Sequence, residues 1–235
     1  MLFQKTIIDL ILAKVPNSKP HFLVVIGPNC SGKTTLTQDI CEIANDKVSV
    51  PVGSRHFILP KPIRLKKGLH GIEPESYEVQ RMQEFVNLLT KNQVTQLAFT
   101  GRREGHYGTN QCNYFNPEKQ MILLEGLPWM YCFNSIPKEN RTVITLLHNN
   151  LQSWLIRTMR RDIEERGYDL IEVKESIIKR TLYLESIKYA IEDSTDIAIL
   201  TSCKDFCQIM ENKNVSEVIQ SYYIDILKCL DFLLN

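Results

Sequence analysis

The sequence predicts an α/β protein in which a mainly parallel sheet lies between two layers of helices. Candidate strands and helices alternate along the chain, which is typical of parallel sheets with helical crossovers. The first strand candidate, residues 21–26 (HFLVVI), is a continuous apolar run of the kind that is buried on both faces. With 235 residues, 43% of them hydrophobic, the chain can bury a substantial core, and we expect a single domain over residues 1–235.

The N-terminal quarter of the chain supplies two helices and two strands. Residues 1–15 carry charges at helical spacing among apolar side chains, which predicts an amphipathic N-terminal helix. After the strand at 21–26, a glycine loop leads into a helical pattern that ends near residue 43. Residues 48–52 are a weaker strand candidate, because Pro51 has no N–H to donate to a sheet ladder.

The middle of the chain is less regular. Residues 60–71 are basic and contain prolines and glycines, so we expect a loop there. Residues 75–90 place apolar side chains at helical spacing and predict a helix, and residues 95–99 are a strand candidate. The polar stretch 101–116 shows no periodicity, so we expect an irregular connection.

The C-terminal half alternates apolar strands with longer helices. Three short apolar runs predict buried strands, at residues 121–124, 142–147 and 196–200. A helical pattern is interrupted at Gly167, which predicts helices at residues 151–165 and 170–191. A last helix is expected at residues 215–234.

Composition excludes several classes of protein. A net charge of +1 gives no global attraction to nucleic acid, and no apolar stretch reaches the length of a membrane span, so neither partner is expected. The seven cysteines are irregularly spaced and form no Cys-x-x-Cys pair, which argues against a disulfide framework and a zinc site. These features predict a cytoplasmic protein. The first and last helices offer faces through which a homo-oligomer could form.

A glycine-rich motif directly follows the first strand. Residues 27–34 (GPNCSGKT), the phosphate loop, match G-x-x-x-x-G-K-[ST], in which glycines let successive backbone N–H groups point at phosphate oxygens. Lys33 is expected to reach the β- and γ-phosphates of a nucleotide. The predicted nucleotide-binding residues are Gly27, Pro28, Asn29, Cys30, Ser31, Gly32, Lys33, Thr34 and Thr35.

Such a loop works with an acidic residue at a neighbouring strand end, which organises a metal ion. Glu125 follows the apolar run at residues 121–124 and precedes Gly126, so it is the candidate. The alternative is a surface glutamate that opens a turn. We therefore predict that ATP binds with Mg²⁺, and that Thr34 and Glu125 contribute to the metal site.

An arginine-rich segment is the second informative stretch. Arg157 and Arg161 are four residues apart and share a helix face, and Arg166 precedes Gly167 at the expected helix end. Arginines near a phosphate loop can clamp a transferring phosphoryl group, because the guanidinium stays charged and donates in a fork. The alternative is a solvated helix in which Arg160 pairs with Glu164, and Arg161 with Glu165. The ion pair is favoured for Arg160, and both interpretations stay open for Arg161 and Arg166.

These motifs together resemble the uridine kinase/phosphoribulokinase family of P-loop kinases. The resemblance covers a kinase-like core at residues 21–200, and its most specific part is RRDIEERGYDL at 160–170. It implies a P-loop three-layer αβα fold with a helical lid and following helix over 151–191. It also implies a kinase that uses ATP and Mg²⁺ to phosphorylate a hydroxyl of a small molecule, nucleoside- or sugar-like. The family's lid arginines contact ATP and the transferred phosphate, so the resemblance makes Arg161 and Arg166 catalytic beside Lys33.

The family's substrate segment, Tyr-Asp followed by His and Arg, is matched loosely. Phe99-Thr100 takes the place of Tyr-Asp, so the acidic residue has no counterpart. Arg102, Arg103 and His106 follow, and the resemblance implies that they bind the phosphate acceptor.

The chain departs from the family after the second strand. Where the family has an aspartate that acts as general base, this chain has Arg55, followed by His56. An arginine cannot accept a proton but can hold an anionic group, so Arg55 is a predicted substrate-binding residue for an anionic acceptor. His56 is the candidate base, because an unperturbed imidazole titrates near pH 6.5. Two functions stay open: a small-molecule kinase, and an ATP-binding module that has lost phosphotransfer and acts through a partner.

Overall fold

The computed structural model describes the chain in nine segments: residues 5–16, 19–69, 71, 73–98, 112–148, 150–165, 167–201, 207–211 and 213–234. The chain divides into two compact units that are interleaved in sequence. The first unit comprises Met1–Ile26 and Thr34–Thr142, and the second comprises Gly27–Lys33 and Val143–Asn235. The phosphate loop therefore belongs mainly to the second unit, although the strand that leads into it belongs to the first.

The first unit is built on three parallel strands. β5 (Ile122–Glu125) lies between β1 (Phe22–Ile26) and β2 (Val52–Gly53), with Val25 and Gly53 both in register with Glu125. All five residues of β1 are buried, as its apolar sequence predicts. The strand expected at 48–52 is shortened to β2, and Val48 contributes only an isolated bridge to Met121. The intervening Pro51 has no N–H for a ladder, which explains the interruption.

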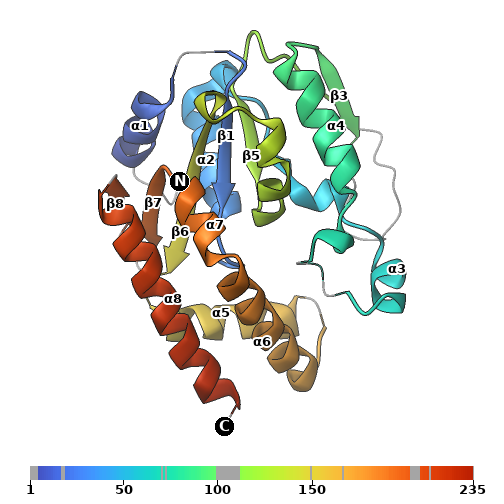
Figure 1. Ribbon diagram of the computed structural model, residues 1–235, viewed down its shortest axis with the longest axis vertical. Coiled ribbons are helices and arrows are strands. Elements are labelled where there is room, and N and C mark those ends of the chain that lie inside the picture. The colour runs from blue at the N-terminus through green and yellow to red at the C-terminus, as the bar shows by residue number, and fades with distance from the viewer. Residues whose placement is uncertain are drawn as a thin grey trace. The chain divides into compact units, whose positions relative to one another are not determined.

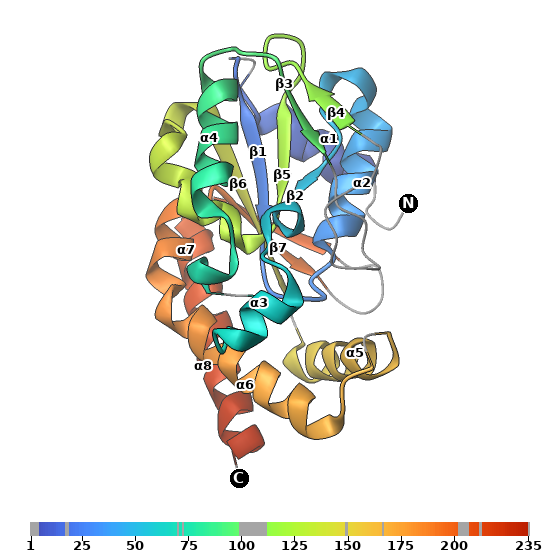
Figure 2. The ribbon, with the colours of Figure 1, turned by 90° about the vertical axis from the view of Figure 1, so that its right-hand side faces the viewer.

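Helices cover both sides of these strands. Figure 2 shows α4 (Val79–Thr90) on one side of β1 and β5, with α1 (Lys5–Lys14) and α2 (Lys33–Ala44) on the other. These three helices confirm the expected helical patterns. One further helix, α3 (Lys61–Lys66), corrects the loop expected at residues 60–71. Pro60 accepts the first hydrogen bonds of α3 through its carbonyl group, so the proline precedes the helix rather than breaking it.

A two-stranded hairpin corrects the irregular connection expected at residues 101–116. β3 (Thr95–Ala98) pairs in antiparallel register with β4 (Cys112–Phe115), so that Thr95 faces Phe115. Residues 99–111 lie outside the described part of the chain. The side chain of Phe115 is fully buried and makes an edge-on contact with Phe85, with ring centroids 5.4 Å apart. This packing, and not a local pattern, holds β4 in place.

An aromatic cluster forms the centre of the first unit. Phe57 contacts Trp129 edge-on at 5.4 Å between centroids, and Phe85 lies 6.0 Å from Phe57 and 6.3 Å from Trp129. Trp129 also donates from Nε1 to the carbonyl oxygen of Val52 at 3.0 Å. The cluster thus ties β2 to α4 and to the 3-10 helix Leu127–Ser135, and it fixes the backbone that leads into Arg55.

Within the described ranges, the second unit contains two whole strands and, from Val143 on, most of a third. β6 (Arg141–His148) and β7 (Ile197–Thr201) are parallel, and both are expected strands. β8 (Cys207–Glu211) pairs with β7 in antiparallel register and was not expected. Its sequence, CQIME, is short and mixed in polarity, so it has no strong strand pattern of its own. The three-layer α/β prediction with a mainly parallel sheet is confirmed, with β8 and the β3–β4 hairpin as its antiparallel parts.

Four helices complete the second unit: α5 (Leu151–Glu164), α6 (Leu170–Ser186), α7 (Lys188–Ser194) and α8 (Lys213–Leu234). Figure 1 shows α8 running beside α6 and α7, and both contacts are close. The single helix expected at 170–191 is divided at Ile187, which leaves helical geometry with φ −110° and ψ 8°. Within the described ranges, no helix is both long enough and apolar enough to cross a lipid bilayer.

Candidate phosphate-binding site

The phosphate loop has the backbone geometry that its glycines permit. Gly27 and Gly32 have φ values of 142° and 91°, which L side chains rarely adopt. A Cβ on Gly27 would lie 2.3 Å from the carbonyl oxygen of Leu146, so a side chain there is also excluded by contact. Cys30 has φ 61°, in the left-handed region. The predicted loop is therefore present as a tight turn against β6.

Two buried side chains hold the outer surface of this loop. Trp154 of α5 donates from Nε1 to the carbonyl oxygen of Asn29 at 2.7 Å. His148, at the end of β6, lies 2.8 Å through Nε2 from the carbonyl oxygen of Cys30. Because the C=O and the following N–H lie on opposite sides of a planar peptide, the N–H groups of Cys30 and Ser31 point away from these partners. The N–H of Ser31 donates to the carbonyl oxygen of Pro28 at 3.4 Å, and the N–H of Cys30 points to the inner side of the loop, the side on which such loops present donors to an anion.

His148 acts here as a neutral donor. Its pKa is lowered to about 4, mainly by burial. The charges of Arg157 and Lys33 also lower the pKa, and together they outweigh the hydrogen bond to Cys30, which raises it. The carbonyl oxygen of Cys30 can only accept, so the proton of the neutral ring resides on Nε2. Sequence reasoning missed both His148 and Trp154. The available signal was position alone, since His148 is the last residue of a buried strand.

The side chain of Lys33 curls back into the loop. Its Nζ donates to the carbonyl oxygens of Gly27 at 3.0 Å and Pro28 at 2.7 Å. The ammonium group therefore lies at the loop itself, as the motif predicts, and adds positive charge to the backbone donors. A phosphate group is a stronger acceptor for this ammonium than a carbonyl oxygen.

Thr34 and Glu125 are brought together from positions 91 residues apart. Thr34 Oγ1 donates to Glu125 Oε1 at 2.7 Å, and Glu125 ends β5 beside β1. A hydroxyl and a carboxylate oxygen are the hard ligands that Mg²⁺ prefers, and this ion usually takes only one or two protein ligands beside water and phosphate oxygens. Among the described residues, no group of three or more His, Cys, Asp or Glu side chains gathers into an alternative metal centre. Metal binding at Thr34 and Glu125 stays a prediction.

Arg55 and His56 follow β2 in a 3-10 helix, Ser54–Phe57. Arg55 is exposed, whereas His56 is buried, with 2% of its surface accessible. Burial, and secondarily the charge of Arg55, lower the pKa of His56 to about 4. The ring is therefore neutral at pH 7, and its titration moves from near pH 6.5 to near pH 4. The roles predicted for Arg55 and His56 stay predictions.

The arginine segment forms α5, with a pairing that differs from one expectation. Arg160 donates from Nε to both carboxylate oxygens of Glu164, at 3.1 and 2.9 Å, so the exposed ion pair predicted there is confirmed. Arg161 instead bonds the buried Asp162, not Glu165. Four predicted site residues lie outside the described part of the chain: Arg102, Arg103, His106 and Arg166.

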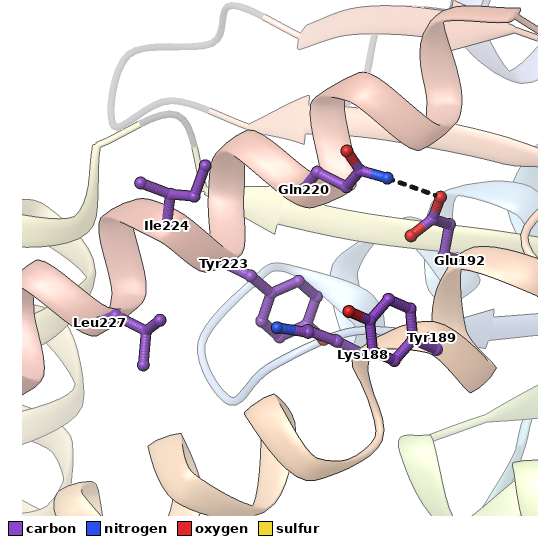
Figure 3. Close-up of a pocket in the computed structure, with 7 residues that line it drawn as sticks. All are labelled: Lys188, Tyr189, Glu192, Gln220, Tyr223, Ile224 and Leu227. Atoms are coloured by element: carbon purple, nitrogen blue, oxygen red, sulfur yellow. Dashed lines mark hydrogen bonds between the residues drawn. The ribbon is translucent and has the colours of Figure 1, made fainter.

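Two cavities of the second unit lie away from the inner side of the phosphate loop. One, of about 270 Å³, opens between α7 and α8, where Gln220 Nε2 donates to Glu192 Oε1 at 3.0 Å (Figure 3). The other, of about 410 Å³, is lined by Leu151, Leu200 and Tyr222 and reaches His148. His148, which bonds the carbonyl oxygen of Cys30, is thus a residue that both lines this cavity and supports the loop.

Comparison with known proteins gives the fold a precedent. No protein-family profile matches the chain, and no curated protein matches it in sequence. Among solved structures, a possible uridine kinase from Bacillus stearothermophilus matches at TM-score 0.53 and 15% identity, over 82% of this chain and 95% of its own. D-glycerate 3-kinase from Cryptococcus neoformans matches at TM-score 0.51 and 12% identity, over 87% and 96% of the two chains.

A protein described as a candidate fructose transport system kinase, from Silicibacter sp. TM1040, matches at TM-score 0.56 and 16% identity, over 73% of this chain and 86% of its own. At such low identity these matches establish the fold alone. The chain therefore has the fold of the P-loop kinases, and its resemblance to uridine kinase and similar kinases is confirmed at that level.

Proposed function

We propose that this protein binds ATP with Mg²⁺ at the phosphate loop and transfers the terminal phosphoryl group to a hydroxyl of a small molecule. The observation that carries the proposal is the contact of Thr34 with Glu125. Thr34 directly follows Lys33, whose ammonium group lies within the phosphate loop. A turn that bound nothing would need neither the inward ammonium nor a carboxylate at the neighbouring strand end. The kinases of similar fold that are named for uridine and D-glycerate support an acceptor with a hydroxyl group.

The chain's own groups divide the work of phosphoryl transfer. Backbone donors of the loop and the N-terminus of α2 bind the phosphates, and Lys33 adds charge at the transferring group. Thr34 and Glu125 would hold Mg²⁺, which would supply positive charge to neutralise the phosphate oxygens. Arg161 and Arg166 are proposed to close over the phosphates from the lid segment, residues 151–191. Such transfer depends mostly on positioning and electrostatics, so a strong general base is not essential.

We further propose that the acceptor is nucleoside- or sugar-like and carries an anionic group. Arg55 supports an anion, because it places an exposed guanidinium where related kinases have a carboxylate. Arg102, Arg103 and His106 are proposed to contribute to the same acceptor site. His56 is the proposed base. A cytoplasmic location, and a homo-oligomer formed through α1 and α8, belong to the same proposal.

The proposed nucleotide site is tested by replacing Lys33 with alanine. Loss of a charge-assisted hydrogen bond, worth roughly 1.5–3 kcal/mol, should weaken ATP binding about 10- to 100-fold. Calorimetric titration with ATP, in the presence and absence of Mg²⁺, measures this change. Lys67→Ala removes an exposed lysine outside the loop and is the control, with wild-type affinity expected. Equal affinities for wild type and Lys33→Ala would contradict the proposal.

The second candidate function is an ATP-binding module without phosphotransfer. The specific observation in its favour is Arg55, which replaces the general base of related kinases by a residue that cannot accept a proton. A screen of ATP consumption with nucleosides, sugars and their phosphorylated or acidic forms separates the two functions. A kinase consumes ATP with one class of acceptor. A module binds ATP, consumes none, and is expected to gain activity on a nucleoside in the variant Arg55→Asp.

A further inference from the structure

The helices α5 and α6 pack through buried stripes that each contain a charged residue (Figure 2). Asp162 lies in the stripe of α5, with an accessible fraction of 0%, and Arg180 lies in that of α6, with 8%. The buried residues are Leu151, Trp154, Leu155, Thr158 and Asp162 on α5, and Val173, Ile177, Arg180, Thr181 and Leu184 on α6. Such positions ordinarily hold apolar side chains, so the two charges require an explanation.

Asp162 is shared by two arginines. Its Oδ1 accepts hydrogen bonds from Arg161 Nε at 3.1 Å and Nη2 at 2.9 Å, and its Oδ2 accepts one from Arg180 Nη1 at 2.8 Å. Within the described ranges, Asp162 is the only carboxylate that forms an ion pair with either arginine. Two guanidinium groups and one carboxylate leave a surplus positive charge in a largely buried cluster.

This surplus is costly in the absence of an anion. Buried charges are tolerated when they are paired, and one arginine would satisfy Asp162. A second arginine adds the desolvation penalty of its own charge without a second carboxylate to offset it. Each guanidinium carries five N–H donors, and the two together commit only three of them to Asp162. The cluster therefore has both the charge and the donors to bind an anion.

The cluster is connected to the phosphate loop through α5. Trp154, Thr158 and Arg161 are spaced four and three residues apart and share one face of the helix. Trp154 is fixed to the loop by its hydrogen bond to Asn29. Arg161 thus lies two helical turns, about 10 Å along the axis, from a point of contact with the loop. The oriented arginines belong to the same compact unit as the loop.

We infer that Arg161 and Arg180, oriented by Asp162, form an anion site that takes the terminal phosphate of bound ATP. Arg180 is then a further phosphate-binding residue, and Asp162 is a positioning residue that fixes the planes of both guanidinium groups. Arg161 contributes the more accessible edge, since 17% of its side chain is exposed. This inference rests on the proposed function, because it requires ATP at the phosphate loop.

The variant Arg180→Met separates this site from a structural role. Methionine has a similar length and no charge, and it leaves Asp162 paired with Arg161. If Arg180 serves only the packing of α6, the variant changes binding of all nucleotides equally or not at all. If Arg180 takes the terminal phosphate, ATP affinity falls about 10- to 100-fold, whereas ADP affinity changes by no more than about twofold. The melting temperature stays equal or rises, because an uncompensated buried charge is removed.

The measurement is calorimetric titration of ATP and ADP, with Mg²⁺, against wild type and each variant. Arg160→Met, at an exposed arginine of the neighbouring helix α5, is the control and should keep the wild-type ratio of affinities. Arg180→Lys retains the charge without the fork and should show a partial loss of the same ATP-over-ADP preference. This second variant provides the test if Arg180→Met does not fold.

Each other outcome overturns the inference. An unchanged ratio of ATP to ADP affinity in Arg180→Met and Arg180→Lys excludes the phosphate contact, even where Lys33→Ala loses affinity for both nucleotides and so supports the proposed function. An equal loss for ATP and ADP, together with a lower melting temperature, assigns Arg180 to packing. A wild-type protein that binds neither nucleotide overturns the inference and the proposed function together.

Discussion

Cys30 adopts a backbone conformation that residues other than glycine rarely take. Its φ of 61° lies in the left-handed region, which costs an L residue on the order of 1–2 kcal/mol. The hydrogen bond from His148 to its carbonyl oxygen holds the peptide in this orientation. The surroundings of the loop therefore maintain the strained conformation of Cys30. This conformation also sets the direction in which the neighbouring N–H groups point.

Substitution of Cys30 tests this strain. Cys30→Gly should leave the free energy of unfolding within about 1 kcal/mol of wild type, because relief of strain offsets the greater flexibility of glycine in the unfolded chain. Cys30→Val should lower it by about 1–3 kcal/mol, since a β-branched residue is poorly tolerated at positive φ. Urea unfolding of the three proteins provides the comparison. Equal stability of the valine and glycine variants would argue against the strained geometry.

The arginines show how far single residues can be predicted. The i, i+4 rule predicted the exposed pair of Arg160 with Glu164, which depends only on one helix. The same rule suggested Glu165 for Arg161, but the structure pairs Arg161 with Asp162. Asp162 also accepts a hydrogen bond from Arg180 of a different helix, and no local rule contains that contact. Side chains on exposed faces follow local spacing, whereas buried ones follow tertiary packing.

At the level of elements, α5 links the phosphate loop to the cluster of Arg161, Asp162 and Arg180. Its N-cap, Asn150, accepts a hydrogen bond from the backbone N–H of Ser153, which fixes where the helix starts after β6. Trp154 then comes within the first turn, and its indole reaches Asn29. The position of the loop's outer surface therefore depends on the start of α5.

Trp154→Phe should weaken ATP binding by about 2- to 10-fold, because the variant removes a hydrogen bond of roughly 0.5–1.5 kcal/mol that orients Asn29 while retaining an aromatic ring in the core. Trp129→Phe is a matched control, since Trp129 also donates its indole N–H to a backbone carbonyl, that of Val52. Both variants should lose comparable stability. Only Trp154→Phe should lose affinity for ATP in calorimetric titration, and a similar loss in both would contradict the assignment.

The elements that sequence patterns did not predict have no clear local pattern of their own. β4 and β8 are short strands of mixed polarity, and each is completed by hydrogen bonds to a partner strand. α3 has only six residues, too few for a clear helical period. The strands β1, β5 and β7 are as short as β4 and β8, at four or five residues each, but their apolar sequences carry a signal of their own, because burial on both faces requires continuous hydrophobic sequence.

At the scale of the whole molecule, buried histidines link stability to pH. Burial lowers the pKa of His21, His56 and His148 to about 4. In the unfolded chain each titrates near pH 6.5, so the unfolded state binds more protons below that pH. The stability gained from burying neutral rings is fully present above about pH 6.5, and it is lost as the pH falls toward 4.

The free energy of unfolding should therefore decrease between pH 6.5 and 5 by up to roughly 1.4 kcal/mol per pH unit for each histidine. Urea titrations at pH 7.5, 6 and 5 measure this slope. His21→Gln should reduce it, because this ring is buried against Thr142 and titrates only on unfolding. A free energy that stays constant across this range in wild type would show that the rings are not buried as neutral groups.

The sequence by itself determined the α/β class and the phosphate loop. The loop's chemistry is contained in consecutive residues, and its glycines, its lysine and the strand before it are all local. The pairing of Thr34 with Glu125 was also predictable, because each follows a buried strand and the carboxyl ends of parallel strands meet at one edge of a sheet. These features depend only on the spacing of residues along the chain and on two parallel strands that lie side by side.

The tertiary structure alone decided how the loop is supported and where the buried charges of α5 and α6 are placed. The bonds of His148 and Trp154 to the loop span more than a hundred residues, and Arg180 meets Asp162 across two helices. A buried polar contact of this kind requires two elements to pack in one particular register, and the sequence of either element does not specify that register. Arg180 could not be identified from the sequence for the same physical reason. In the sequence of α6 it is one charged residue within an apolar stripe, and its contact with Asp162 exists only in the folded protein.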